Sequence, residues 1–163
     1  MQLAVRYTNT ELVALLLERG ADMFTVDDFG GTPLSYAYQY FRKPLHVFVE
    51  RLMEMPVNER KSFKDKNGRN LLHCAVMAGN VNTVKTLIYE GLNVNSQDNE
   101  KVTPLLLAAE GGDIEIVKLL LAHGADIHGI DCHKRTSQHY AATGGNVEIV
   151  KLFTEKGLKL DAK

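Results

Sequence analysis

The chain has 163 residues, with 19 Lys and Arg, 20 Asp and Glu, and a formal net charge of −1. Nucleic acids and anionic membrane surfaces attract proteins that carry an excess of positive charge, so neither is expected as a partner. The sequence has neither a signal peptide nor an apolar run of about 18 residues; we therefore expect no membrane insertion and a cytoplasmic or nuclear location.

The first segment, residues 4–22, contains a run of helical periodicity that ends in the turn Gly20-Ala21-Asp22. It lacks the Thr-Pro start that opens the next segment, so the chain begins inside a structural unit. Met1 is therefore either the edge of a fragment, which we favour, or a true terminus with an incomplete first unit.

The second segment begins at Asp27 and is longer than those that follow it. From Asp27 to Asp65 the distance is 38 residues, against a period of 33 in the rest of the chain. We place three of the five extra residues at 40–44, where they would lengthen the turn between two helices, and two at 56–64. Insertions in repeat proteins map to loops, often on the binding face, but most are simply tolerated, and the sequence leaves both interpretations open.

Three further segments begin at Asp65, Asp98 and Asp131, one every 33 residues. A fixed period of about 20–50 residues indicates a solenoid, in which stacked units bury a shared core. Within each segment we predict a first helix, a glycine turn and a second helix. Thr103 before Pro104 suits a helix N-terminus, and a glycine suits the left-handed end of a helix. The predicted turn glycines are Gly79, Gly112 and Gly145, followed by the capping residues Asn80, Asp113 and Asn146.

These recurring residues resemble the ankyrin repeat family over essentially the whole chain. The resemblance is carried by Thr32-Pro33-Leu34, Thr103-Pro104-Leu105, the glycine turns, and the Gly-Ala-Asp sequences at 20–22 and 124–126. It implies an all-α solenoid of helix-turn-helix units with projecting β-hairpin turns. We expect a single domain, 1–163, with about five repeats: 1–26 (partial), 27–64 (with the insertion), 65–97, 98–130 and 131–163.

The last repeat departs from the others at two positions that are apolar elsewhere. Gln138 stands where Leu105 stands in the preceding repeat, and Thr154 replaces a buried aliphatic residue. A terminal repeat needs a polar outer face, so these changes fit a C-terminal cap; a divergent inner repeat is the alternative.

A group of zinc-ligand residue types lies between positions 123 and 139: His123, His128, Cys132, His133 and His139. Their spacing does not match a metal motif, and we expect them to lie on different elements. His139 shares its repeat position with His73, where the ankyrin pattern has a histidine that makes structural hydrogen bonds. We therefore predict no metal site and no cofactor.

The sequence also lacks the motifs of common catalytic sites. Neither a phosphate-binding GxxxxGK[ST] loop nor a GxSxG nucleophile turn occurs. Glu115 and Glu148 repeat at one helix position and mark an exposed face. We predict that the chain is not an enzyme.

The resemblance to ankyrin repeats implies a partner-binding surface made of the hairpin tips and the exposed face of each first helix. The residues that this register places there are Arg6, Tyr7, Phe29, Gln39, Tyr40, Lys66, Asn67, Arg69, Met77, Asn99, Glu100, Val102, Glu110, Cys132, His133 and Arg135. Aromatic residues and arginine dominate binding hot spots, and the amino-terminal half holds most of the aromatic ones. They favour a partner with acidic and apolar side chains, unless Phe29 and Tyr40 instead pack onto the irregular second repeat.

We therefore predict a monomeric protein–protein interaction scaffold whose partner the sequence does not identify. One alternative is a targeting or regulatory segment of a larger enzyme, channel or secreted effector. Another is that the module is itself a substrate, because Asn95 occupies a place at which ankyrin repeats can be hydroxylated.

Overall fold

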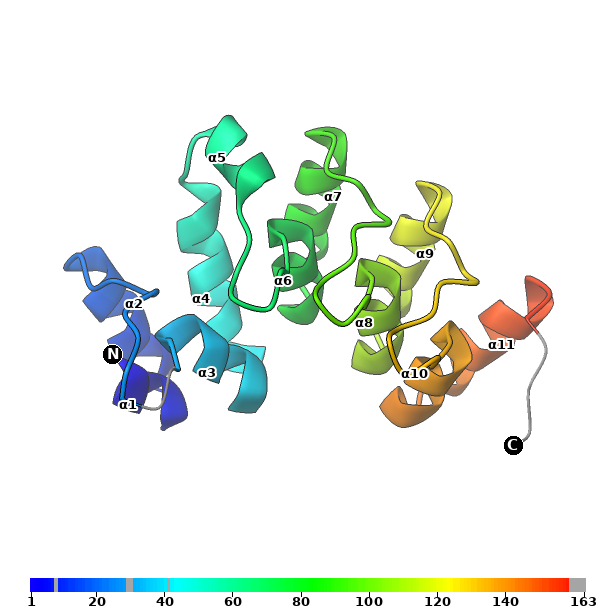
Figure 1. Cartoon of the computed structure of the whole chain (residues 1–163), viewed down its shortest axis with the longest axis horizontal. Helices are drawn as coiled ribbons and strands as arrows, with labels where there is room; N and C mark the ends of the chain where they lie inside the picture. Colours follow the sequence, from blue (N-terminus) through cyan, green and yellow to red (C-terminus); the bar gives the residue numbers. More distant parts are fainter. Residues whose placement is uncertain (8, 29–30, 41, 159–163) are drawn as a thin grey trace. The chain divides into compact units, whose positions relative to one another are not determined.

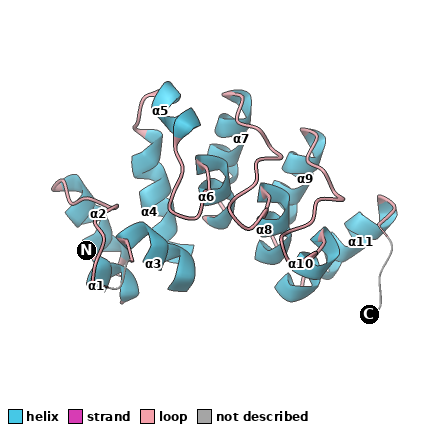
Figure 2. Cartoon of the chain, in the orientation of Figure 1, coloured by secondary structure: helices cyan, strands magenta, loops and turns pink. Residues whose placement is uncertain are grey.

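The structure is a computed structural model that describes residues 1–7, 9–28, 31–40 and 42–158. The chain divides into two units, Met1–Arg60 and Lys61–Lys163. The described residues form helices α1 to α11 joined by loops, as Figure 2 shows. No helix among them combines the length and the apolar composition needed to cross a bilayer.

The first unit consists of stacked helical hairpins. Its helices are α1 (Gln2–Arg6), α2 (Thr10–Glu18), α3 (Pro33–Tyr40) and α4 (Arg42–Met53). They are followed by α5 (Val57–Ser62), whose last two residues belong to the second unit. Helix α1 packs against α2 and α3, and α4 packs against α2 and α3. The buried side chains at the centre of this unit include Val5, Val13, Leu17, Leu34, Phe48, Val49 and Leu52.

Among the described residues of the predicted insertion at 40–44, all lie in helices and none in a longer turn. Helix α4 begins at Arg42, directly after the single residue that separates it from α3, and the later extra residues lie in or beside α5. The predicted lengthening of the turn at 40–44 is therefore wrong. Pro44 is compatible with this helix because it is the third residue, where a backbone N–H has no intrahelical partner.

The second unit repeats one helical hairpin three times. The pairs are α6 (Leu71–Met77) with α7 (Val81–Tyr89), α8 (Pro104–Gly111) with α9 (Ile114–Ala122), and α10 (Ser137–Gly144) with α11 (Val147–Glu155). The first helices form one layer, in which α8 packs against α6 and α10, and the second helices form another, in which α9 packs against α7 and α11 (Figure 1). This arrangement confirms the predicted all-α stack of helix-turn-helix units.

The glycine turns and caps of the second unit are as predicted. Gly79, Gly112 and Gly145 have left-handed φ values of 68°, 72° and 69°. The side chains of Asn80, Asp113 and Asn146 then accept hydrogen bonds from backbone N–H groups of the following helix. Thr103 caps α8, which has Pro104 in its first turn. Each cap satisfies a helix donor that would otherwise lack a partner.

His73 is buried in the core of the second unit, where it joins two repeats. Its Nδ1 lies 2.7 Å from Asn70 Oδ1, and its Nε2 lies 3.1 Å from the carbonyl oxygen of Val102. His139, at the same position two repeats later, accepts a hydrogen bond from the Thr136 N–H at Nδ1 (3.2 Å). Both histidines therefore make the structural hydrogen bonds expected from the sequence.

Candidate partner-binding surface

Each repeat of the second unit begins with a tight turn built around its aspartate. The Oδ1 atom of Asp98 accepts hydrogen bonds from the N–H groups of Glu100 and Val102, both at 2.9 Å. Asp131 Oδ1 does the same for His133 at 2.9 Å and Arg135 at 2.8 Å. Because the carboxylate replaces backbone partners that a short turn cannot supply, an aspartate recurs every 33 residues.

The turns are closed by a few backbone hydrogen bonds and not by regular strands. The N–H groups of Asp65, Asp98 and Asp131 donate to the carbonyl oxygens of the residues four positions later, at 3.0, 3.1 and 3.2 Å. Among the described residues, one isolated antiparallel bridge, between Ile130 and Thr136, extends this pairing. The predicted β-hairpins are thus short turns with at most one bridge.

Consecutive turns are also joined to each other by their backbones. The N–H of Asn99 donates to the carbonyl oxygen of Asn67 at 2.9 Å, and the N–H of Cys132 donates to that of Glu100 at 2.8 Å. These bonds place residues 66–67, 99–100 and 132–133 in one continuous line, which we call the hairpin row. The backbone of the row is therefore fixed, and Lys66, Asn99, Glu100, Cys132 and His133 in it are exposed.

The Asp131 turn carries an additional side-chain network. Arg135 Nε donates to Asp131 Oδ2 at 2.6 Å, and the Tyr140 hydroxyl donates to the same oxygen at 2.9 Å. The Arg135 guanidinium lies 4.9 Å from the centre of the Tyr140 ring, a cation–π distance. Burial would raise the pKa of Asp131, but these hydrogen bonds, together with those from the Arg135 and His133 N–H groups, lower the pKa to about 2. Burial and the bond to Asp131 raise the pKa of Tyr140.

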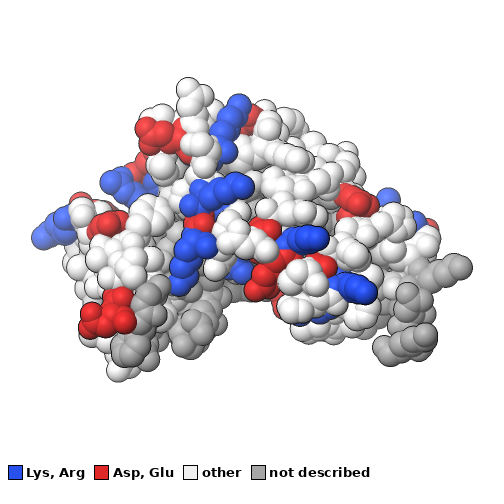
Figure 3. Space-filling model, viewed as in Figure 1, with Lys and Arg blue, Asp and Glu red and all other residues white. Residues whose placement is uncertain are grey.

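Most of the predicted surface residues of the second unit are solvent-accessible. Lys66, Asn99, Glu100, Glu110, Cys132, His133 and Arg135 are exposed, whereas Asn67, Arg69 and Met77 are half-buried. Val102 is a correction: it is 4% exposed and its side chain belongs to the core, so it cannot line a binding surface. Figure 3 shows basic and acidic side chains lying next to one another over much of the face in view.

The aromatic part of the predicted surface is only partly described. Tyr7 is 80% exposed. Phe29 and the side chains of Arg6, Gln39 and Tyr40 lie outside the described parts of the structure. The aromatic contribution of the first unit therefore remains a prediction.

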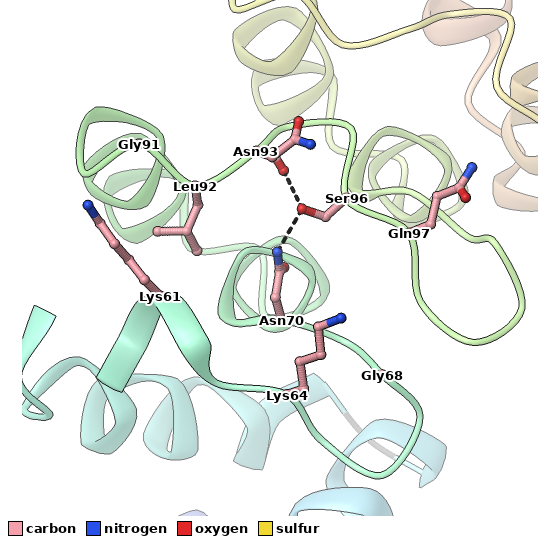
Figure 4. Close-up of a pocket in the computed structure, with 9 residues that line it drawn as sticks. All are labelled: Lys61, Lys64, Gly68, Asn70, Gly91, Leu92, Asn93, Ser96 and Gln97. Atoms are coloured by element: carbon pink, nitrogen blue, oxygen red, sulfur yellow. Dashed lines mark hydrogen bonds between the residues drawn. The ribbon is translucent and has the colours of Figure 1, made fainter. Parts of the chain in front are cut away.

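The second unit also contains a polar pocket of about 340 Å³ that the sequence analysis did not anticipate. Its lining comes from the start of the unit, the Asp65 turn and the loop after α7: Lys61, Lys64, Gly68, Asn70, Gly91, Leu92, Asn93, Ser96 and Gln97. Asn70 Nδ2 donates to Ser96 Oγ at 2.9 Å, and Ser96 Oγ donates to the Asn93 carbonyl at 2.6 Å (Figure 4). Two lysines beside bonded amides could contact a small anionic group, but the lining offers no nucleophile–base pair.

Asn95 is exposed, and both ends of its amide contact the next repeat. Its Nδ2 donates to the Gly124 carbonyl at 3.0 Å, and its Oδ1 accepts from the Asp126 N–H at 2.8 Å. These bonds give Asn95 a structural role in joining two repeats.

Three potential metal donors meet at the end of the hairpin row. One ligand atom each from Glu100, Cys132 and His133 lie within 4.8 Å of one another, and all three residues are exposed. The sequence analysis considered Cys132 and His133 but expected the candidate donors to lie apart. It did not consider Glu100, because that residue belongs to the preceding repeat.

Comparison with known proteins identifies the type of repeat. A family model described as ankyrin repeats in three copies matches residues 1–98 and 81–163. The ankyrin repeat protein FPV223 of fowlpox virus is 32% identical over 107 residues, which are 66% of this chain and 71% of that protein. ZDHHC13 of Danio rerio, named as a palmitoyltransferase, is 33% identical over 113 residues, and human inversin is 35% identical over 96 residues. These two matches cover 68% and 57% of this chain but only 17% and 9% of the relatives.

Proposed function

Because the chain belongs to the ankyrin repeat family, we propose that it is a non-catalytic scaffold that binds a partner protein through the hairpin row and the adjoining first helices. The observation that carries this proposal is the pair of backbone hydrogen bonds, at 2.9 and 2.8 Å, that joins three consecutive turns into one line. Ankyrin repeats generally mediate protein–protein interaction.

The fixed backbone of the hairpin row supports binding on energetic grounds. A surface that is already ordered loses little conformational entropy when a partner docks, so more of the contact energy appears as affinity. The exposed side chains of the row include Lys66, Asn99, Glu100 and His133. This mixture of charges and amides favours a partner segment of mixed polarity at the second unit. At the first unit, Tyr7 and the predicted aromatic residues favour acidic and apolar partner side chains.

Two side chains of the described chain with strongly shifted pKa values, Asp131 and His73, have structural roles that explain the shifts. This supports a non-catalytic role. Asp131 is held by hydrogen bonds within its own turn, and His73 is buried between repeats. Catalytic groups also have perturbed pKa values, but they must be able to reach a substrate. His73 is fully buried and Asp131 is only 2% exposed.

Site-specific photocrosslinking tests the proposed surface directly. A photoreactive residue at Asn99, in the hairpin row, is compared with one at Glu115, an exposed residue on α9. In lysate of the native cell we expect a discrete crosslinked protein from position 99 and none from position 115. Its capture should be lost in a Lys66→Ala/Glu100→Ala/His133→Ala variant and kept in a Lys85→Ala/Glu115→Ala/Lys151→Ala control. Equal crosslinking from both positions would place the interaction elsewhere.

A role as part of a larger protein is the second candidate. The matched segment is only 17% of ZDHHC13 and 9% of inversin, so sequences of this kind occur within longer chains. In that case the scaffold would target or regulate an activity located outside these 163 residues. The full reading frame decides the matter, since an additional domain on either side supports this role.

We also propose a monomer in the cytoplasm or nucleus. Neither Cys74 nor Cys132 is part of a disulfide in the described chain, and reducing compartments keep cysteines in the thiol form. Imaging of the tagged full-length protein and light scattering of the purified chain test these two points.

A further inference from the structure

We propose that Glu100, Cys132 and His133 form a binding site for a single Zn²⁺ ion. This inference does not depend on the identity of any partner protein. It rests on the geometry of three donor groups from two consecutive repeats, whose ligand atoms all lie within 4.8 Å of one another.

The chemistry of the three donors favours zinc over the other common cations. Zn²⁺ binds thiolate sulfur, imidazole nitrogen and carboxylate oxygen, usually in tetrahedral geometry, whereas Mg²⁺ and Ca²⁺ prefer sites made entirely of oxygen. With three protein ligands, the fourth position is left for water or for another donor. All three side chains are exposed, so an ion can reach them from solvent.

The donor separations are close to those that a bound ion requires. Metal–ligand distances of about 2.0–2.3 Å in a tetrahedron place neighbouring ligand atoms about 3.3–3.6 Å apart. The three ligand atoms here lie within 4.8 Å of one another, so their largest separation exceeds the required one by little more than an ångström. Rotations of three exposed side chains can close this difference without movement of the backbone.

The backbone beneath the site is already fixed in position. The Cys132 N–H donates to the Glu100 carbonyl oxygen at 2.8 Å, which ties the two turns together. Asp98 holds the Glu100 N–H at 2.9 Å, and Asp131 holds the His133 N–H at 2.9 Å. Binding therefore requires the ordering of three side chains and not of the two turns, which lowers its entropic cost.

The surrounding contacts are compatible with metal binding. Two exposed lysines adjoin the donors in the sequence, Lys101 after Glu100 and Lys134 after His133. The Arg135 guanidinium, by contrast, is engaged by Asp131 and Tyr140. A bound ion would link the turn of one repeat to the turn of the next. Because the zinc ion would bind the folded chain and not the unfolded one, it would raise the free energy of unfolding of the second unit. This increase would grow with the logarithm of the zinc concentration.

The test is zinc binding by the full-length chain, kept reduced with a phosphine in a buffer without chelators. Competition with a chromophoric zinc indicator should give one Zn²⁺ per chain, and zinc should raise the melting temperature. Co²⁺ used as a probe should show absorption from thiolate-to-cobalt charge transfer. Cys132→Ser, His133→Gln and Glu100→Gln should each weaken zinc binding more than about tenfold, since loss of supporting groups alone costs 10–100-fold in metal sites.

Two exposed residues outside the cluster supply matched controls. His128→Gln and Glu115→Gln should bind zinc as the parent does, and circular dichroism should show that every variant has the parent's helix content. The proposal is overturned if Cys132→Ser binds zinc as tightly as the parent, or if the Co²⁺ complex lacks the thiolate band. A stoichiometry of one ion per two chains would also overturn it, because the ion would then join two molecules.

Discussion

The hydroxyl group of Tyr140 donates a hydrogen bond of 2.9 Å to Asp131 Oδ2. Tyr36 makes the equivalent bond to Asp27 Oδ2 at 2.7 Å in the first unit, and in both pairs the tyrosine follows the aspartate by nine residues. In the two repeats between them this position holds Cys74 and Leu107, which cannot replace the hydroxyl. The recurring aspartates thus share one backbone role but differ in what contacts their second oxygen.

Tyr140→Phe should lower the free energy of unfolding by about 1.5–3 kcal/mol, because a hydrogen bond to a buried carboxylate is lost while the ring is retained. Urea denaturation followed by circular dichroism measures the change. Tyr89→Phe is the matched control: Tyr89 is 71% exposed, and its variant should differ from the parent by less than about 0.5 kcal/mol. Equal effects of the two substitutions would show that the Tyr140 bond contributes no stability of its own.

The contribution of each aspartate to stability should depend on what its second carboxylate oxygen contacts. Asp131 Oδ2 contacts Arg135 and Tyr140, whereas Asp65 Oδ2 is buried without a hydrogen-bond partner. Accordingly, burial raises the pKa of Asp65, whereas the pKa of Asp131 is lowered to about 2.

Asp131→Asn should therefore destabilise the chain by about 2–4 kcal/mol, because the amide NH₂ would face the donors of Arg135 and Tyr140. Asp65→Asn keeps the oxygen that accepts the backbone N–H groups and replaces the unbonded one, so its cost should stay below about 1 kcal/mol. Denaturant unfolding of the two variants measures which substitution lowers the free energy of unfolding more. A larger loss for Asp65→Asn would contradict it.

The regular parts of this fold could be predicted from the sequence because they depend on local chemistry. Thr103-Pro104, Gly112 and Asp113 determine where helices begin and end through their own backbone preferences and hydrogen bonds. For the insertion, the predicted conformation was wrong, because helix α4 begins at Arg42 where a longer turn was expected. Whether residues near Pro44 extend a turn or start a helix depends on packing, which a repeat alignment does not contain.

The surface was predicted less completely for a related reason. The repeat register identified the exposed residues of the hairpin row, but it treated Val102 as exposed although its side chain points into the core. The register also considered each repeat separately, and so it could not bring Glu100 together with Cys132 and His133. Contacts between repeats follow from the stacking geometry, and the spacing within one repeat does not show them.

Mild acid should destabilise the second unit through His73. Burial lowers the pKa of His73 to about 4, although the hydrogen bond to Val102 and the charge of Asp98 oppose this effect. The unfolded chain, with a pKa of about 6.5, then binds more protons than the folded chain between pH 6.5 and 4. The contribution of neutral His73 to the free energy of unfolding is therefore fully present above pH 6.5. It should fall by about 3 kcal/mol on acidification to pH 4.

Urea unfolding at half-unit pH intervals measures this dependence, and two variants assign it. His128→Gln removes an exposed histidine and should retain the parent's slope between pH 6.5 and 4. His73→Asn should be less stable at pH 7 and should lose most of that slope. Because the pKa of folded Asp131 is lowered to about 2, its own contribution to the free energy of unfolding disappears only as the pH falls from about 4 toward 2. A parent stability that rises on acidification would mean that the two acceptors around His73 outweigh its burial.

The close approach of α8 and α10 should make Gly144 far more sensitive than its neighbour Gly145. A Cβ atom at Gly144 would lie 2.4 Å from the Glu110 carbonyl oxygen and 2.8 Å from that of Ala109. These are backbone atoms, so the helices would have to separate. Gly145 has a left-handed φ of 69° but no atom within 4 Å of an added Cβ, so its substitution introduces only conformational strain. We expect Gly145→Ala to cost about 1–2 kcal/mol and Gly144→Ala about 3 kcal/mol or more.

Thermal and urea unfolding of the two variants separate the two effects, since each adds the same methyl group at an adjacent position. The larger loss for Gly144→Ala should be accompanied by weaker hydrogen-exchange protection in both α8 and α10, because these helices share the contact. Gly145→Ala should affect mainly the turn between α10 and α11. If Gly145→Ala proved the more damaging change, the left-handed turn, and not the packing of the first helices, would limit the stability of the last repeat.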